Sequence, residues 1–215
     1  MMYRGLFTRP AGQVFTNFED RHIVEPYEIP NHWKRAQGVD FGEVNTASTF
    51  AARNPETDKW VVYRDYHAGK IPAEEHVKSF IYGEFSDFDP WCWGGAPSED
   101  DWRRQFADAD WTIMRPPTKD IFVGIQLLNS MFADDQIEIF NSCTRTINQI
   151  RELSYELGET GEPNPAKIEK EKDYHLVAAL RYMATGISKY DMSGTVTELG
   201  VNFDADGPRV IRMSG

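Results

Sequence analysis

Asp40 is the first residue whose type and place in the sequence could serve chemistry. It lies in the strand-like segment RAQGVDFG, residues 35–42, although Asp is disfavoured inside strands. Side chains alternate along a strand, so Asp40 shares its face with Gly38 and Gly42, and we expect open room above the carboxylate. That room suits a hydrated metal ion or a phosphate. An Asp at a strand end that accepts a hydrogen bond from a turn amide is the alternative.

A second group of acids lies in GGAPSEDDWRR, residues 94–104, where Glu99, Asp100 and Asp101 follow a short apolar strand. We expect Ser98 to cap a helix here, with the three acids in its first turn. Acids at this position ordinarily interact favourably with the helix dipole. The two preceding glycines permit close backbone approach, which adds a functional interpretation.

The third group lies in DYHLVAALRYM, residues 173–183, which reads as a helix that begins at an Asp173 cap. Ala178 lies off its apolar stripe, and His175 either orients a ligand or is a packed, hydrogen-bonded histidine. The stripe itself is formed by Leu176, Leu180, Met183 and Ile187.

The elements that must position these residues follow from periodicity, caps and turn residues. We expect an extended lead-in over residues 1–35 and a mobile loop over residues 158–172. Strands are predicted at 35–42, 46–53, 60–66, 91–93, 111–115 and 136–140. Helices are predicted at 72–85, from Ser98 onward, at 121–132, at 144–157 with Leu157 buried, and at 173–187. An antiparallel hairpin followed by α/β alternation predicts a mixed α/β sheet with helices on both faces.

Composition limits the class of protein. A chain of 215 residues with 40% hydrophobic residues suffices for one domain with a core and is not a disordered chain. No apolar run approaches the roughly 18–20 residues that span a bilayer, and the opening MMYRGLFTRP is not a secretory signal. The doubled Met suggests a start codon placed on an internal segment, hence an excised domain.

Charge and cysteine content constrain partner and compartment. The net charge of −11 argues against binding nucleic acid by bulk electrostatics, although clustered carboxylates bind phosphate once cations neutralise them. Cys92 and Cys143 are too few for a disulfide framework or a four-ligand zinc site, so we expect buried thiols in a reducing cytosol.

Taken in order, GVDFG, a strand hairpin, GGAPSEDDWR, KDIFVGIQ and YHLVAALRYM resemble the C-terminal nuclease half of tailed-bacteriophage terminase large subunits, over roughly residues 3–187. The resemblance implies an RNase H-like fold in which three acids bind two Mg²⁺ or Mn²⁺ ions. The first acid matches Asp40. The second matches Glu99, with Asp100 or Asp101 as substitutes.

The third acid of that family lies in a motif similar to H-x-x-D-A-L-R-Y, and here the chain departs from it. His175 and Arg181 match, but Ala178 stands where the resemblance implies Asp. Asp173 lies five residues away and about 140° around the helix, so it is poorly placed to substitute. A single carboxylate-to-methyl change in an intact motif indicates an inactivated form, engineered or natural.

The resemblance also implies a mechanism, in which two ions activate the hydroxide and stabilise the leaving oxygen during phosphodiester hydrolysis. Asp40 would bridge the ions, while Glu99 and the missing acid would hold one each. Candidate phosphate contacts are Arg103, Arg104 and Lys119, for which solvated surface charge is the alternative.

The implied partners are double-stranded DNA, the ATPase domain of the same terminase, the portal protein and the small terminase subunit, in the host cell cytoplasm and without a membrane. The corresponding domain division is a lead-in from the ATPase domain at 1–35, the nuclease domain at 36–190 and a C-terminal tail at 191–215.

Two rival interpretations stand beside this one. A non-catalytic domain that grips DNA or contacts the portal fits the missing acid. An actin-like ATPase or sugar-kinase lobe shares an opening strand with an Asp among glycines, but the sequence lacks the later glycine-rich phosphate turns.

Overall fold

A six-stranded mixed sheet organises the computed structural model, which describes residues 12–81, 90–191, 203–204 and 207–208. The strand order is β1-β6-β4-β3-β2-β5. Its strands are β1 (Ile23–Val24), β2 (Arg35–Asp40), β3 (Thr46–Arg53), β4 (Trp60–Ala68), β5 (Trp91–Gly94) and β6 (Ile137–Phe140). The helices are α1 (Ala73–Ile81), α2 (Asp100–Asp108), α3 (Ile121–Ala133), α4 (Thr144–Glu152) and α5 (His175–Asp191).

The predicted antiparallel hairpin is confirmed and extends into a three-stranded meander of β2, β3 and β4. The turn between β3 and β4 forms where the turn residues predicted it. The Asn54 side chain accepts a hydrogen bond from the backbone N–H of Glu56 at 2.9 Å. Asp58 closes the turn with φ of 62°, a left-handed conformation that Asp tolerates better than most residues.

Parallel strands flank the meander, since β5 pairs with β2 and β6 pairs with β4. The prediction of a strand at 111–115 is wrong, because within this segment only Met114 forms a β-bridge, and its partner is Trp93. Met114 donates its N–H to Cys92 at 2.8 Å and accepts from Gly94 at 3.0 Å. Two prolines follow at 116 and 117, and because proline lacks the N–H, the ladder does not continue.

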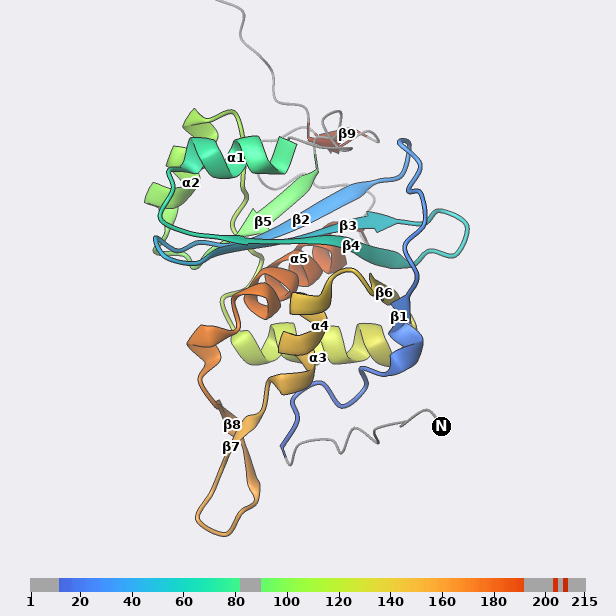
Figure 1. The fold of residues 1–215 in the computed structure, drawn as a ribbon, viewed down its shortest axis with the longest axis vertical. Helices are drawn as coiled ribbons and strands as arrows, with labels where there is room; N and C mark the ends of the chain where they lie inside the picture. Colours follow the sequence, from blue (N-terminus) through green and yellow to red (C-terminus); the bar gives the residue numbers. More distant parts are fainter. Residues whose placement is uncertain (1–11, 82–89, 192–202, 205–206, 209–215) are drawn as a thin grey trace, which may run out of the picture.

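Helices cover both faces of the sheet, as predicted (Figure 1). Helices α1 and α2 lie on one face, where Phe50 packs against Phe80 and Phe41 packs against Phe106. Helices α3, α4 and α5 lie on the other, and α5 crosses β2 and β3 directly. The predicted stripe of α5 is confirmed, with Leu176, Leu180, Met183 and Ile187 all buried.

Several predicted boundaries are wrong in the region between α4 and α5. Helix α4 ends at Glu152 rather than Leu157, and Leu157 is 52% exposed instead of buried. The predicted loop over residues 158–172 contains a strand, β8 (Pro163–Ile168), paired with β7 (Tyr155–Leu157), and a 3-10 turn (Glu171–Asp173). This hairpin projects away from the body of the molecule (Figure 1). Helix α5 begins at His175, so Asp173 is not its N-cap.

The other predicted segments to compare with the structure are the lead-in, the helix at 72–85 and the C-terminal tail. The expected extended lead-in contains a 3-10 turn (Asp20–His22) and β1. The helix predicted at 72–85 is described as far as Ile81, and residues 82–85 lie outside the described residues. Most of the expected tail at 191–215 lies outside them too, apart from the short pair β9 (Phe203–Asp204) and β10 (Gly207–Pro208).

Both cysteines are free and buried, as expected. Burial raises the pKa of the Cys143 thiol to about 12, which keeps the thiol protonated and unreactive. Across the part of the chain that the structure describes, no helix combines the length and apolar character needed to cross a bilayer.

Candidate functional site

Asp40 ends β2 and directs its carboxylate toward α5. His175 Nδ1–H, in the first turn of that helix, donates to Asp40 Oδ2 at 2.8 Å. This bond to Asp40 raises the pKa of the His175 imidazole, against the opposing effect of burial. The two side chains are mostly but not fully buried, at 17% exposure for Asp40 and 22% for His175. They therefore form a partly shielded ion pair that solvent still reaches.

The glycines beside Asp40 do not leave open space, which corrects the expectation. A Cβ on Gly38 would overlap the backbone carbonyl of Ala179. Gly42 is covered by Asn45 of the following turn. Gly38 thus lets α5 approach the sheet closely, and this approach brings His175 onto Asp40.

Glu99 lies at the N-cap of α2, just after β5, the parallel neighbour of β2. Ser98, the expected cap, does not occupy that position. The Glu99 carboxylate accepts a hydrogen bond from the backbone N–H of Ala96. Burial raises the pKa of Glu99, and the negative charge of Asp40 raises it further. Asp40 ends β2 and Glu99 follows β5, so the two acids lie at the ends of neighbouring parallel strands.

Ala178 lies one turn after His175 and one turn before Tyr182 along α5. Burial is the largest cause that raises the pKa of the Tyr182 hydroxyl, and the negative charges of Asp40 and Glu99 raise it further. Of the two residues one turn from Ala178, His175 contacts Asp40 directly. The side chain of Ala178 is partly exposed and also lines a small hollow with Tyr174.

The donor atoms present do not fit two divalent ions. Among residues 12–81 and 90–191, no group of three or more His, Cys, Asp or Glu side chains is arranged to hold a metal. Hard divalent cations need several oxygen ligands, and Mg²⁺ demands near-octahedral geometry. Asp40 and Glu99 supply two carboxylates, and the methyl group of Ala178 supplies no ligand. The residues present therefore match an incomplete two-ion site.

The two substitutes for Glu99 point to other partners. Asp100 pairs with Arg103 at 2.8 Å and with Arg115, whose hydrogen bond lowers the pKa of Asp100. Asp101 pairs with Arg104 on the exposed side of α2. Glu99 is thus the acid of this trio whose pKa the charge of Asp40 raises, and Asp100 as a metal ligand is not favoured by its placement.

We expected Arg103 to contact phosphate, but its buried position in the structure does not fit that expectation. The side chain is buried, and its guanidinium donates to the carbonyls of Gly94, Gly95 and Ala96 at 2.7–3.0 Å. A guanidinium with five N–H donors suits such a cluster of acceptors. Arg103 therefore braces the loop that carries Glu99.

The other expected basic residues lie in different environments. Arg104 and Lys119 are exposed. Arg181 is buried, with its alkyl chain against Gly124 and its guanidinium over the Tyr182 ring and 3.9 Å from Glu171. Arg181 thus packs α5 against α3.

Sequence reasoning missed His67 as a neighbour of the site. His67 on β4 lies with its ring centroid 6.0 Å from that of His175. The signal available was strand alternation in the hairpin, which places His67 on the same face as Asp40 once the register is known.

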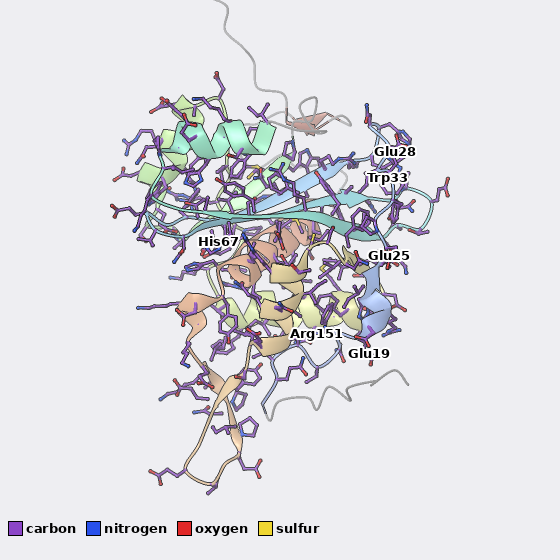
Figure 2. All side chains as sticks on the ribbon, viewed as in Figure 1. Glu19, Glu25, Glu28, Trp33, His67 and Arg151 are labelled. Atoms are coloured by element: carbon purple, nitrogen blue, oxygen red, sulfur yellow. The ribbon has the colours of Figure 1, made fainter. Side chains whose placement is uncertain are left out.

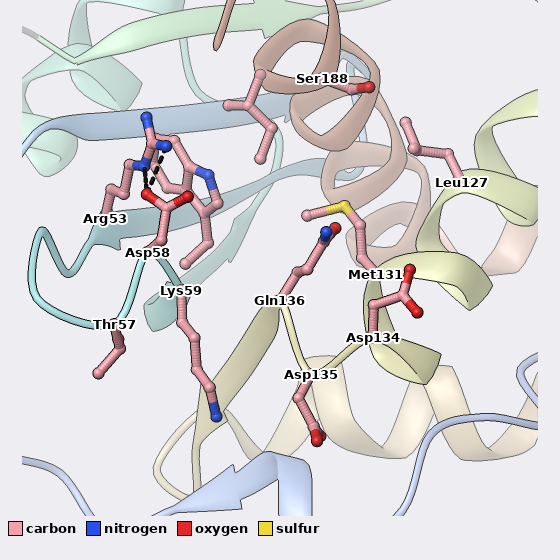
Figure 3. A pocket seen from close by; sticks show the side chains of 12 residues that line it. Arg53, Thr57, Asp58, Lys59, Leu127, Met131, Asp134, Asp135, Gln136 and Ser188 are labelled. Atoms are coloured by element: carbon pink, nitrogen blue, oxygen red, sulfur yellow. Dashed lines mark hydrogen bonds and ion pairs between the residues drawn. The ribbon is translucent and has the colours of Figure 1, made fainter. Parts of the chain in front are cut away.

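A larger cavity of about 430 Å³ lies elsewhere, between the β3–β4 turn and the end of α3 (Figure 3). Met131 and Ile187 contribute apolar lining, and Asp58 and Asp134 lie at its edge. Ile187 belongs to the last turns of α5, whereas His175 is at its start. This cavity is thus separate from the Asp40 site.

Comparisons with known proteins place the fold. No protein-family model and no curated protein sequence matches the chain. The large terminase nuclease domain of phage P22 is similar in structure, with a TM-score of 0.60 and 18% identity over 81% of this chain and 92% of that one. The SPP1 large terminase nuclease domain with bound Mn gives 0.59 and 16%, over 81% and 97%.

A large terminase from a thermophilic bacteriophage gives a TM-score of 0.67 at 18% identity, over 86% of this chain but 47% of that one. The chain thus spans about half the length of that protein. Together these similarities show that the chain has the fold of large terminase nuclease domains, and the expected RNase H-like α/β fold is confirmed.

Proposed function

We propose that this chain is the nuclease domain of a viral genome-packaging large terminase, in a form whose set of catalytic acids is incomplete. The observation that carries the proposal is that Asp40, at the end of β2, is hydrogen-bonded to His175 in the first turn of α5, while Glu99 follows β5, the parallel neighbour of β2. The likeness to the P22 and SPP1 nuclease domains supports it.

The proposed catalytic set is Asp40, Glu99 and the residue at position 178. Partly buried carboxylates suit Mg²⁺ or Mn²⁺, which prefer oxygen ligands. The bound Mn of the SPP1 domain is consistent with this choice of metal. Since Ala178 provides no ligand, we assign no cleavage step to the chain as it stands. Asp at this position would give three carboxylates in the arrangement that the sequence resemblance implies.

The proposed substrate is double-stranded DNA, and the proposed partners are an ATPase domain of the same polypeptide, the portal protein and the small terminase subunit. The large terminase of the thermophilic bacteriophage supports the ATPase partner, because it is about twice as long and has also been solved with ADP. Arg104 and Lys119 are exposed and stay candidates for phosphate contacts, with the host cytoplasm as the proposed compartment.

The decisive experiment is Ala178→Asp. We expect the substitution to convert an inactive protein into a Mg²⁺- or Mn²⁺-dependent endonuclease with little sequence preference. Loss of one electrostatic contribution to the transition state typically costs about 10²–10³-fold in rate, so a difference of that order should be measurable. The assay is nicking and linearisation of supercoiled plasmid, with each metal and with a chelator.

Ala178→Asn is the matched control, since its side chain has the size of Asp without the charge, and it should remain inactive. Asp40→Asn in the Ala178→Asp chain should abolish the gained activity. If the present sequence already cuts as fast as Ala178→Asp, position 178 is not catalytic. If neither cuts while both bind DNA, the non-catalytic DNA-gripping or portal-contacting role, which the missing acid favours, replaces this proposal.

A further inference from the structure

His67 lies in the same lateral row of the sheet as Asp40. Asp40 of β2 is paired with Ala47 of β3, and Ala47 is paired with His67 of β4. Residues directly opposite each other in antiparallel strands point to the same face. Asp40 faces α5 through its bond to His175, so His67 faces α5 as well. Figure 2 shows His67 on the side of the sheet that α5 covers.

The His175 side chain extends from α5 toward this row, between Asp40 at one end of the row and His67 at the other. Its Nδ1–H reaches Asp40 at 2.8 Å, and its ring lies 6.0 Å from the His67 ring, centroid to centroid, at an interplanar angle of 30°. The middle residue of the row is the fully buried Ala47, whose small side chain leaves room for an imidazole. His175 therefore has the Asp40 carboxylate on one side and the His67 ring on the other.

The surroundings of His67 lower the pKa of its imidazole. Burial lowers the pKa of His67, and the positive charges of His175 and Arg145 lower it further, against Asp65 on its own strand. Asp65 is itself engaged, because its Oδ2 accepts from both the N–H and the hydroxyl of Thr146 at 3.1 Å.

One ring nitrogen of His67, Nε2, is buried and makes no hydrogen bond within the described residues. An unpaired buried nitrogen costs free energy. Within the described residues, Nε2 therefore does not bind His67 to another group. The contact of His67 with the candidate site is the contact between its ring and that of His175.

We propose that His67 is a positioning residue of the candidate site, whose ring holds the His175 imidazole in the orientation from which Nδ1–H reaches Asp40. The consequence for catalysis rests on the proposed function, whereas the positioning itself does not. A misplacement of about 1 Å in a catalytic site can cost on the order of 10²-fold in rate.

The primary test is nuclear magnetic resonance of the full chain with ¹⁵N-labelled histidine. The Asp40-bonded Nδ1–H of His175 should give a downfield proton that exchanges slowly and disappears in His175→Gln. We expect His67→Ala to lose or broaden this signal, and His67→Phe, which keeps a ring of similar size, to retain it. His32→Ala, at an exposed histidine, is the control and should leave the signal unchanged.

A retained signal in His67→Ala would overturn the proposal, as would a lost signal in a folded His67→Phe. In the Ala178→Asp chain, His67→Ala should lower kcat for plasmid cleavage about 10- to 100-fold with KM unchanged, and His67→Phe should restore it. An unaltered kcat would remove the catalytic consequence. Because the resonance experiment needs no cleavage, failure of the proposed nuclease would leave the positioning result standing.

Discussion

Three histidines around the sheet, at positions 67, 76 and 175, show how neighbours move the pKa of one residue type in opposite directions. The carboxylate of Asp40 raises the pKa of His175, whereas burial lowers the pKa values of His67 and His76. His76 lies on the buried face of α1 and is itself fully buried, with its Nδ1 2.8 Å from the Tyr66 hydroxyl and its ring stacked on Phe106. Position in the fold, rather than residue type, therefore decides in which direction the pKa of each imidazole moves.

His76 should make the protein sensitive to mild acid. Its folded pKa lies below the unfolded value of about 6.5, so below that pH the unfolded chain binds a proton that the folded chain does not. Stability from this group is therefore present above pH 6.5 and falls as pH drops toward the folded pKa, by up to about 1.4 kcal/mol per pH unit.

His76→Phe should remove this contribution while keeping the aromatic packing. Urea unfolding of both proteins between pH 5 and 7.5 gives the difference in free energy of unfolding as a function of pH. His67 and His175 titrate in both proteins and cancel in that difference. Parallel curves for the two proteins would show that His76 does not titrate abnormally.

Among the acids and bases of the candidate site, Asp40 and Glu99 could be singled out from the sequence as candidates, but the structural role of Arg103 could not. A strand Asp among glycines and an acid after a strand are visible in the sequence. The three carbonyls that Arg103 binds become acceptors only because the backbone turns at Gly95, which has φ of 73°. Such convergence of backbone groups is a property of the loop conformation, and a basic residue in sequence looks the same whether solvated or buried.

At the scale of elements, the contact between α5 and β2 decides whether the site assembles. Gly38→Ala should disrupt it, because the new Cβ would overlap the Ala179 carbonyl, which is backbone and cannot rotate away. Overpacking of this kind typically costs about 1–3 kcal/mol or more. We expect a loss near the upper end in urea unfolding, together with loss of the His175–Asp40 proton signal.

Gly158→Ala is the matched control, since a Cβ there meets only the Glu162 carbonyl at 3.6 Å, an ordinary contact. It should change the free energy of unfolding by less than about 0.5 kcal/mol. An equal effect of the two substitutions would mean that helix packing at Gly38 is not the cause.

Elements with strong local patterns were predicted well, and those fixed by distant partners were not. The strand Thr46–Arg53 was predicted residue for residue, because turns bound it on both sides. Helix α4 stops early because distant residues take over the backbone hydrogen bonds that would have continued it. The Tyr155 N–H donates to Gly12 at 2.8 Å, and the Ser154 carbonyl accepts from Glu169 at 2.8 Å. The prediction extended the helix to Leu157 on the basis of local periodicity. Local periodicity contains no information on those distant partners.

At the scale of the whole molecule, residues 12–24 belong to the folded body rather than leading into it. Val14, Phe15, Phe18 and His22 are buried. Phe15 and Phe18 pack against Phe132 of α3 with ring centroids 6.2 and 5.0 Å apart. The pairing of β1 with β6 adds a sixth strand to the sheet. The predicted division at residues 35 and 36 therefore cuts through packed structure, because apolar residues in a proline-rich stretch look unstructured until their distant partners are known.

Deletion of residues 2–24 should therefore destabilise the domain severely. Burying one large apolar side chain contributes about 1.5–3 kcal/mol, so three of them together approach the 5–15 kcal/mol that typically separates folded from unfolded domains. We expect the deleted chain to be largely unfolded at 25 °C by circular dichroism, and Phe15→Ala in the full chain to cost about 3–5 kcal/mol in urea unfolding. The point variant separates loss of packing from loss of chain length. If the deleted chain unfolds at the same urea concentration as the full one, residues 36–190 fold independently, the segment before them is a lead-in after all, and the contacts of Phe15 and Phe18 with Phe132 contribute nothing measurable to stability.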